Sequence, residues 1–306
     1  MLELAIMVEG QNGLNWPRWQ RIARAVEDLG FAGLYRSDHF TNAGPPDLDS
    51  LELWVSLTWL AANTRRIEFG PLVTPLSFRD PVMTARMASA VDDLSGGRLI
   101  LGVGAGWQER EHTAFGYDLL PPGKRLKRFR EGMEVITKLL RNDEPVSYTG
   151  AYYRLQEAVL LPRPAHPNRP AVLIGGGKAI LPDVARCANE WNVAFTTPRA
   201  FTELNEKLNV ALRNAGRSPA DVRRSLMTGL IFGRDDAELE RRITARNLSF
   251  DDLRSRGLAV GTPSQIVDQL GQLASAGVQR VMLQWLNLDD LDGLERLAEG
   301  VLPQLK

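Results

Sequence analysis

Short apolar runs alternate along the chain with longer stretches in which apolar residues recur at helical spacing, eight times in all. Such an alternation predicts a parallel sheet, because each helix carries the chain back to the edge where the next strand begins. Eight strand and helix pairs favour a closed (β/α)8 barrel (a TIM barrel), for which about 250 residues plus insertions are usual. An open, doubly wound sheet is the alternative fold. The predicted strands are residues 4–8, 33–37, 67–74, 99–103, 172–174, 191–195, 225–232 and 281–285.

Two segments interrupt this rhythm. Residues 143–170 contain aromatic residues and many prolines without a helical period, which predicts an insertion between the fourth strand and helix pair and the fifth strand. Residues 235–258 are highly charged and predict a helical excursion at the surface. No linker or internal repeat divides the chain, so we expect a single domain that spans residues 1–306.

Composition limits the classes of partner. Lysine plus arginine and aspartate plus glutamate both number 37, so no overall field favours nucleic acid or a membrane surface. The single cysteine, Cys187, fits a reducing compartment, and the first residues do not resemble a signal peptide. No apolar stretch is long enough to cross a bilayer of about 30 Å. We therefore expect a cytoplasmic protein whose partner is a small-molecule substrate.

In a barrel of this kind, functional residues lie at the carboxyl ends of the strands, because the loops there form one face. Four segments after predicted strands are polar or rich in glycine where packing alone does not require it. These segments are residues 37–40, 72–74, 102–107 and 175–178. We expect them to meet at one mouth of the barrel.

The two glycine clusters do not match the known nucleotide motifs. Trp107 stands where the dinucleotide-binding pattern needs its third glycine, and Ala179 stands where a P-loop needs serine or threonine. The run Gly175-Gly176-Gly177-Lys178 nevertheless predicts a cradle of backbone N–H groups for a phosphate, with Lys178 adding charge. A plain turn between strand and helix is the alternative.

His39 is one of three histidines and follows Asp38 at a predicted strand end, where an imidazole can exchange protons near neutral pH. A structural histidine on the rim is the alternative. His112 is interpreted as a residue near the site or at an exposed helix start, and His166 as a loop residue. The sequence contains no metal-binding pattern and no serine-nucleophile motif, so neither chemistry is supported.

Three groups of residues together resemble the luciferase-like monooxygenase superfamily (LLM class), and within it the branch that uses the deazaflavin coenzyme F420. The similarity extends from the N-terminus to about residue 195, and the ordered set is more specific than any one motif. The groups are Ser37-Asp38-His39-Phe40, Gly70-Pro71-Leu72-Val73-Thr74-Pro75 with Phe78-Arg79-Asp80-Pro81, and residues 94–107. Further similarities are Glu111-His112, Phe115-Gly116, Tyr152-Tyr153, Pro162-Arg163-Pro164 and residues 174–177.

The resemblance implies a role for each matching residue. It places Asp38 and His39 beside the cofactor ring, with His39 as the proton-transfer group. It implies a cis peptide bond between Leu72 and Val73 that forms a bulge behind the ring, and it places Thr74 among the residues that bind the cofactor. Gly104, Ala105 and Gly106 then line the ring pocket, and Gly175, Gly176, Gly177 and Lys178 receive the phosphate.

One residue departs from the resemblance. Members of the family that oxidise glucose 6-phosphate have an acid where this chain has Trp107, so that substrate is not predicted. Glu109 is close enough to act as a catalytic acid instead. Trp107, Tyr152 and Tyr153 are interpreted as an apolar wall that keeps water from the ring, or as packing residues.

The predicted function is therefore an oxidoreductase that transfers a hydride between coenzyme F420 and a small organic substrate, in a homodimer. One alternative is a luciferase-like monooxygenase that uses reduced flavin mononucleotide (FMN) and O2. Another is a protein that binds flavin or deazaflavin without turnover. A cofactor-free hydrolase or lyase would need paired carboxylates or a lysine at the strand ends, and the sequence shows neither clearly.

Overall fold

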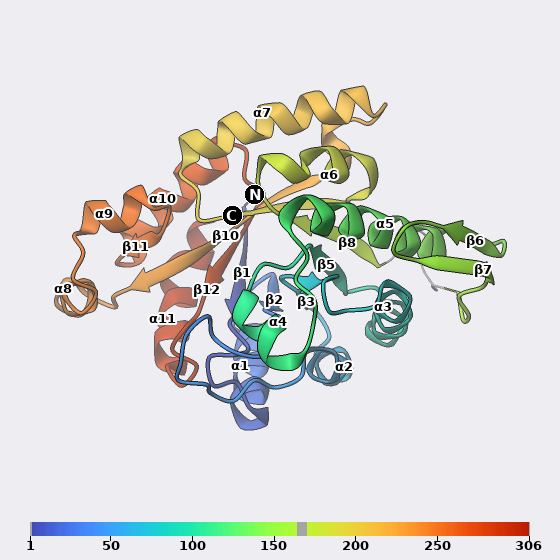
Figure 1. The fold of residues 1–306 in the computed structure, drawn as a ribbon. Coiled ribbons are helices and arrows are strands. Elements are labelled where there is room, and N and C mark those ends of the chain that lie inside the picture. Colours follow the sequence, from blue (N-terminus) through green and yellow to red (C-terminus); the bar gives the residue numbers. More distant parts are fainter. Residues whose placement is uncertain (1, 164–169, 306) are drawn as a thin grey trace.

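The computed structural model describes residues 2–163 and 170–305. Eight parallel strands form the central sheet (Figure 1). The third of them is divided into two segments, β3 and β4. They are β1 (Glu3–Val8), β2 (Gly33–Arg36), β3 (Glu68–Pro71) with β4 (Thr74–Pro75), β5 (Ile100–Gly104), β8 (Ala171–Gly175), β9 (Glu190–Ala194), β10 (Arg223–Phe232) and β12 (Arg280–Gln284).

The sheet closes on itself. Its strand order is β3-β2-β1-β12-β10-β9-β8-β5-β4, so both ends of the order belong to the one stretch of chain that holds β3 and β4. A bridge between Phe69 and Leu99 and a 3.2 Å hydrogen bond from the Phe69 N–H to the Arg98 carbonyl join the two edges. The predicted (β/α)8 barrel is confirmed, and the open doubly wound sheet is excluded.

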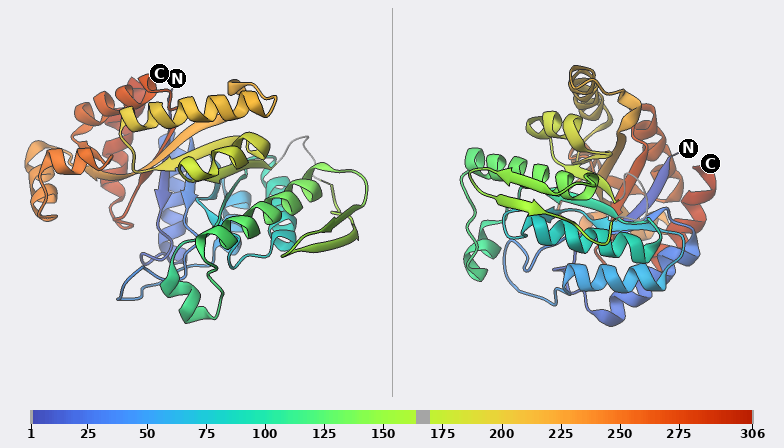
Figure 2. Two further views of the ribbon diagram at one scale, coloured as in Figure 1. Left: turned by 45° about the horizontal axis from the view of Figure 1, so that its top comes forward. Right: turned by 90° about the vertical axis from the view of Figure 1, so that its right-hand side faces the viewer.

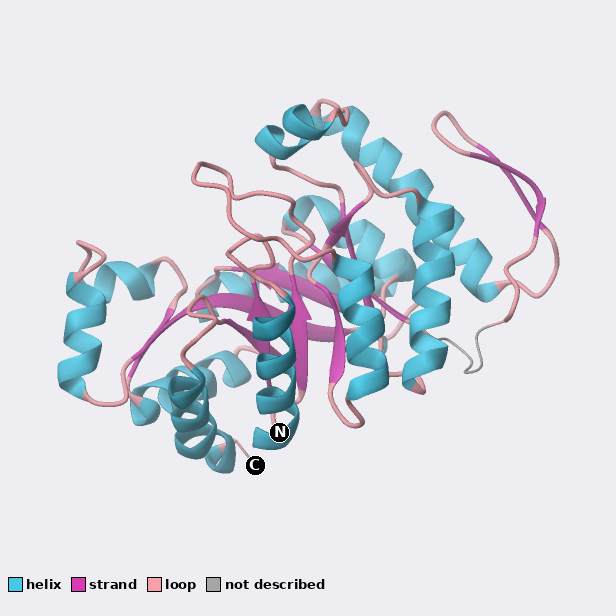
Figure 3. Cartoon of the chain, turned by 90° about the horizontal axis from the view of Figure 1, so that it is seen from below, coloured by secondary structure: helices cyan, strands magenta, loops and turns pink. Residues whose placement is uncertain are grey.

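Helices surround the strands, as the view in Figure 3 shows. Their ends follow from local sequence: the Asp80 side chain accepts from the N–H groups of Val82 and Met83 to start α3, which ends at Gly96 with a φ of 69°. None of the helices in the described ranges combines the length and hydropathy that crossing a membrane requires. The covering helices are α1 (Trp16–Leu29), α2 (Leu53–Asn63), α3 (Pro81–Ser95), α5 (Pro122–Arg141), α6 (Leu181–Cys187), α7 (Pro198–Asn214), α10 (Pro263–Ser275) and α11 (Leu291–Val301).

Side chains fill the interior of the barrel between the strands. Side chains that point inward, including Met7, Tyr35 and Ile100, form a buried cluster of their own. Below them, at the amino ends of the strands, buried Arg280 pairs with Glu3 and Glu190. Ion pairs therefore occupy the amino-terminal end of the barrel, and the loops that follow the strands form its carboxyl-terminal end.

Smaller elements differ from the predicted order. Residues 143–170 include an antiparallel hairpin of β6 (Val146–Thr149) and β7 (Arg154–Ala158), which projects beyond α5 (Figures 1 and 2). Helix α4 (Glu109–Phe115) precedes α5, and the charged stretch folds into α8 (Asp236–Thr244) and α9 (Phe250–Ser255). The short β11 (Ala259–Gly261) pairs with β10 and was missed, because three residues carry no periodic signal. That residues 1–306 form one domain stays a prediction.

Closure of the barrel depends on Gly70. A Cβ added there would lie 1.9 Å from the carbonyl oxygen of Ile100. The two backbone segments cannot move apart, because Gly70 lies in β3 and Ile100 in β5, and both are barrel strands. Overpacking costs about 1–3 kcal/mol or more, so Gly70→Ala should lower the free energy of unfolding in urea by about 2 kcal/mol. The matched control is Gly271→Ala in α10, where an added Cβ meets nothing within 4 Å. That variant should be unchanged or more stable by about 0.5–1 kcal/mol; equal losses in both variants would contradict this account.

Candidate functional site

A cavity of about 640 Å³ opens at the carboxyl ends of the barrel strands. Ligand pockets usually enclose about 300–1,000 Å³. Its walls come from the ends of β1, β2, β3, β4, β5, β8, β9 and β10 and from α4. The lining residues are Met7, Glu9, Ser37, His39, Leu72, Val73, Pro75, Gly104, Ala105, Gly106, Trp107, Glu111, Gly175, Gly176, Gly177, Asn192, Val193, Ala194, Phe195 and Met227.

The four segments selected from the sequence all reach this cavity, but not with every residue. His39, Leu72, Val73 and the glycines of residues 104–106 and 175–177 line it. The cis peptide bond between Leu72 and Val73 that the resemblance implied is present, between β3 and β4. Asp38, Thr74, Glu109 and Lys178 are absent from the lining, and each has a definite place elsewhere.

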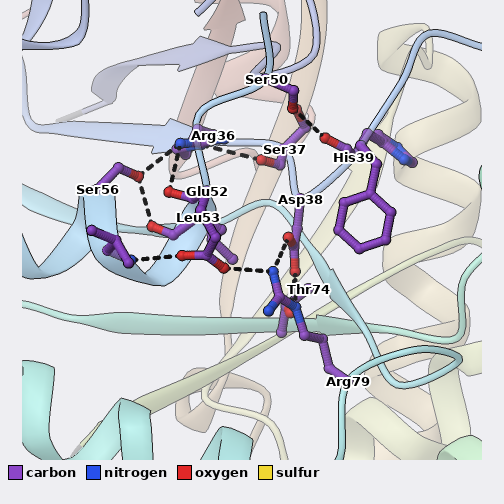
Figure 4. A network of polar contacts seen from close by, with 12 residues as sticks. Arg36, Ser37, Asp38, His39, Ser50, Glu52, Leu53, Ser56, Thr74 and Arg79 are labelled. Carbon is purple, nitrogen blue, oxygen red and sulfur yellow. Dashed lines mark hydrogen bonds and ion pairs between the residues drawn. The ribbon is translucent and has the colours of Figure 1, made fainter. Parts of the chain in front are cut away.

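Asp38 lies behind the cavity wall instead of facing the ring position. Its Oδ2 accepts from the Thr74 hydroxyl (2.6 Å) and from Arg79 Nε (3.0 Å), and its Oδ1 accepts from Arg79 Nη2 (2.7 Å). Arg79 also donates to Glu52 at 2.9 Å (Figure 4). Neither Asp38 nor Thr74 lines the cavity: together with Arg79 they tie the loop after β2 to β4, and contact of these two residues with a cofactor stays a prediction.

The loop that carries His39 is held on its other side by Arg36. This buried guanidinium donates to the Ser56 hydroxyl at 2.7 Å, as Figure 4 shows. It also donates to the Leu51 carbonyl at 2.6 Å. Burial lowers the pKa of Arg36 to about 10, although nearby carboxylates oppose the change. The Ser50 hydroxyl donates to the His39 carbonyl at 2.7 Å. The backbone of His39 is therefore fixed before any ligand binds.

The His39 ring is oriented by Glu111 of α4. Its Nδ1 lies 2.9 Å from Glu111 Oε1, while Glu111 Oε2 accepts from the Phe40 N–H at 3.0 Å. The other ring nitrogen, Nε2, has no hydrogen-bond partner among the described residues, in a side chain that lines the cavity. The Trp107 ring packs edge-on at 5.5 Å between centroids. The site therefore presents one imidazole nitrogen to a ligand.

Electrostatics favour the protonated ring. Burial lowers the pKa of His39, but the hydrogen bond and the charge of Glu111 outweigh it, with smaller contributions from Glu9 and Asp38, so the pKa is raised above 6.5. Because the folded chain binds this proton more tightly than the unfolded chain, the stabilisation is fully present below about pH 6.5 and is lost as the pH rises through the folded pKa.

Glu109, which the sequence suggested as a catalytic acid, does not line the cavity. It is exposed in the first turn of α4, whereas Glu111 is buried and contacts His39. Two residues apart on a helix point about 200° apart, so only one of these carboxylates can face the cavity. His112 is also buried, with Nε2 2.8 Å from the Ser77 hydroxyl and Nδ1 2.6 Å from the Gln108 carbonyl, and lies outside the lining. His166 falls outside the described residues.

The glycine loop after β8 offers fewer donors than the sequence predicted. The Gly176 N–H already donates to the Asn192 carbonyl at 2.9 Å. The N–H groups of Gly177 and Lys178 have no acceptor among the described residues, at the start of the short helix η1 (Lys178–Ile180). The Lys178 side chain is exposed and lies beside the cavity, not in its wall.

Sequence reasoning missed the contributions of β1, β9 and β10. Glu9 follows β1, and its carboxylate accepts from Gln284 Nε2 (2.6 Å) and Gln11 Nε2 (2.9 Å). Phe195 follows β9, and Met227 comes from β10. Applying the rule for strand ends to all eight predicted strands, instead of four, would have found Glu9 and Phe195.

The predicted aromatic wall is only partly correct. Trp107 lines the cavity, but the two tyrosines lie beyond α5 in the turn between β6 and β7. The Tyr153 hydroxyl accepts from Arg128 Nε at 3.1 Å, and the Tyr152 N–H donates to Glu131 at 2.8 Å. Met7, Val193, Phe195 and Met227 supply the apolar surface that we had assigned to the tyrosines.

Known proteins with a similar sequence or structure were found for nearly the whole chain. A family model described as luciferase-like monooxygenase matches residues 4–256. The F420-dependent glucose-6-phosphate dehydrogenase of Kineococcus radiotolerans is 25% identical over 92% of this chain and 90% of that protein. The 5,10-methylenetetrahydromethanopterin reductase of Archaeoglobus fulgidus is 24% identical over 92% of this chain and 94% of that protein. A solved F420-dependent secondary alcohol dehydrogenase, in complex with an F420-acetone adduct, has a TM-score of 0.87 at 17% identity, over 100% of this chain and 99% of that one. This last likeness shows the fold.

The raised pKa of His39 depends on the charge of Glu111. Replacing Glu111 with glutamine removes that charge and places an amide beside Nδ1, so the pKa should fall to 6.5 or below. An NMR titration of the His39 ring measures this directly. Glu109→Gln makes the same change on the exposed face of α4 and should leave the titration unaltered. A His39 pKa that is equally high in all three proteins would contradict the pairing.

Proposed function

The chain belongs to the luciferase-like monooxygenase family, and we propose that it is an oxidoreductase that transfers a hydride between coenzyme F420 and a small organic substrate. The strongest support is the imidazole of His39, which is held by Glu111 at Nδ1 and faces the cavity with Nε2. Two of the relatives compared above are F420-dependent by name, which favours the deazaflavin over FMN.

The cavity suits a flat ring with a phosphorylated tail. Val73, Ala105 and Met7 offer apolar surface on which a ring can lie, and the glycines beside them keep the approach free of side chains. The N–H groups of Gly177 and Lys178 have no acceptor among the described residues, which supports a role for them as donors to the phosphate. When it is bound, the deazaflavin supplies or accepts the hydride.

His39 manages the proton that accompanies this transfer. Its raised pKa favours the protonated ring more than in a free imidazole, so Nε2 can donate to a substrate atom during reduction and can take the proton back in the reverse direction. Glu111 balances the positive charge from the far side of the ring. Trp107, at the rim and 62% exposed, shields the imidazole and narrows access for water.

The lining also limits the substrate. Among the described residues it contains two carboxylates, Glu9 and Glu111, of which Glu111 pairs with His39, and no lysine or arginine. A cavity with this charge favours neutral or cationic molecules over phosphorylated ones, and Trp107 adds an apolar surface. We therefore do not extend the substrate of the glucose-6-phosphate dehydrogenases to this chain. A homodimer and a cytoplasmic location stay predictions.

Binding and turnover test the proposal separately. Titration with oxidised F420 and with FMN, followed by fluorescence, should show saturable binding of F420 and weaker binding of FMN. A panel of small secondary alcohols and unsaturated ketones then gives a substrate, with turnover followed by the absorbance of oxidised F420. In His39→Ala, kcat should fall by about 10²–10⁴-fold with little change in the F420 dissociation constant.

Three outcomes would contradict parts of this proposal. Tight binding of FMN without F420 would favour the flavin monooxygenase. Binding of F420 without turnover across the panel would favour a carrier protein. Turnover that is unchanged in His39→Ala would remove the proton-transfer role, and Glu109→Gln on the exposed face of α4 provides the matched control.

A further inference from the structure

A second cleft lies at the opposite, amino-terminal end of the barrel. It encloses about 490 Å³ between α7, the end of α10 and the first residues of β10 and β12. Its polar lining consists of Asn205, Asn209, Arg224 and Gln279, and within residues 2–163 and 170–305 no aspartate or glutamate lines it. Apolar residues, among them Leu2 and Val278, complete the wall. The cleft shares no residue with the cavity that we assign to the cofactor.

Arg224 is a buried cation without a counter-charge. Its exposure is 5%, and it forms no ion pair with any carboxylate in the described part of the chain. Burial lowers its pKa, and no neighbouring charge acts in either direction. Arg280 on the adjacent strand is equally buried, but it pairs with Glu3, Glu68 and Glu190. The fold therefore neutralises one of these two arginines and leaves the other positive.

Arg224 is held by amide and carbonyl oxygens alone. Its Nε donates to Asn205 Oδ1 at 2.9 Å, its Nη2 donates to Asn209 Oδ1, and its backbone N–H donates to Gln279 Oε1 at 2.8 Å. Its Nη1 donates to the carbonyls of Pro219 and Val222. A guanidinium has five N–H groups. The second N–H on Nη2 is left without an acceptor among the described residues.

These contacts fix the orientation of three side-chain amides. Because an arginine only donates, the oxygen of each amide must face Arg224, and the NH2 group must point away from it. None of these NH2 groups has an acceptor among the described residues. A Cβ added to Gly277, which lines the cleft, would lie 3.0 Å from Asn205 Nδ2, so this NH2 group reaches the cleft wall. The cleft therefore presents donors around an uncompensated positive charge.

We propose that this cleft binds a small organic anion through its carboxylate or phosphate oxygens. The oxygens accept from the NH2 groups of Asn205, Asn209 and Gln279, and the positive charge of Arg224 behind these amides attracts the anion. The hydrocarbon part of the ligand packs on Leu2 and Val278. The site lies outside the proposed active site, so its existence does not depend on the function proposed above.

Titrating the full-length protein by calorimetry tests the site, with inorganic phosphate and with butyrate in separate experiments at a constant ionic strength set by chloride. Saturable binding of at least one probe is expected, and the stronger probe identifies the ligand class. Asn209→Asp keeps an acceptor for Arg224, removes the NH2 donors and neutralises the charge, so it should weaken binding at least tenfold. Phosphate held by the loop at Gly177 would not respond to this substitution.

Asn214→Asp is the matched control, because it makes the same charge change on an exposed residue of α7 outside the cleft. It should bind as the wild type does. Gln279→Glu, on an exposed residue, repeats the test should Asn209→Asp fail to fold. No saturable binding of either probe, or unchanged binding in Asn209→Asp or Gln279→Glu, would overturn the proposal and leave Arg224 a purely structural residue.

Discussion

The active cavity exists because the side chain of Val73 packs where three neighbouring strand positions carry none. A Cβ added to Gly102 or Gly175 would lie 3.2 Å from Val73 Cγ1, and one added to Gly104 would lie 2.6 Å from Val73 Cγ2. A side chain at Gly104 would displace Val73, and one at Gly102 would also meet the Pro71 carbonyl oxygen at 2.0 Å. Val73 lies between the end of β3 and the start of β4, and the next residue, Thr74, donates a hydrogen bond to Asp38. The cavity therefore has an apolar wall on which a ring can lie. The bulge and the glycines form one unit, so their spacing in the sequence identifies the site better than any single residue.

Charged residues at the two ends of the barrel have different roles. At the carboxyl end, Asp38 and Arg79 form a bidentate pair that fixes the loop, while Glu111 holds His39 so that one ring nitrogen stays free. At the amino end, Arg280 is surrounded by carboxylates and closes the barrel, whereas Arg224 nearby has none. Removing one partner of a buried ion pair is strongly destabilising, whereas the uncompensated charge of Arg224 is the basis of the anion site that we propose. The same chemistry of arginine and carboxylate therefore serves stability at one position and recognition at another.

The sequence predicted the barrel, the four segments of the site and His39, because periodicity and glycine spacing are local signals. It did not predict which way individual side chains point. Asp38 and His39 are neighbours, yet adjacent residues in extended chain face opposite sides, and only His39 reaches the cavity. Glu109 and Glu111 likewise point in different directions, because they are two residues apart on the helix α4. The positions of Tyr152 and Tyr153 depend on a hairpin that no periodic pattern in the sequence predicts. The orientations of the amides around Arg224 follow only from their hydrogen bonds in the structure.

A crystal structure of the full chain with oxidised F420 is the most direct test of the central claim that these loops form a deazaflavin site. The account predicts that the ring packs against Val73 at the strand ends, with the phosphate at the N–H groups of Gly177 and Lys178 and with His39 Nε2 facing the reactive side of the ring. Electron density for the coenzyme at another face of the molecule, or a cavity that stays empty at saturating coenzyme, would contradict it.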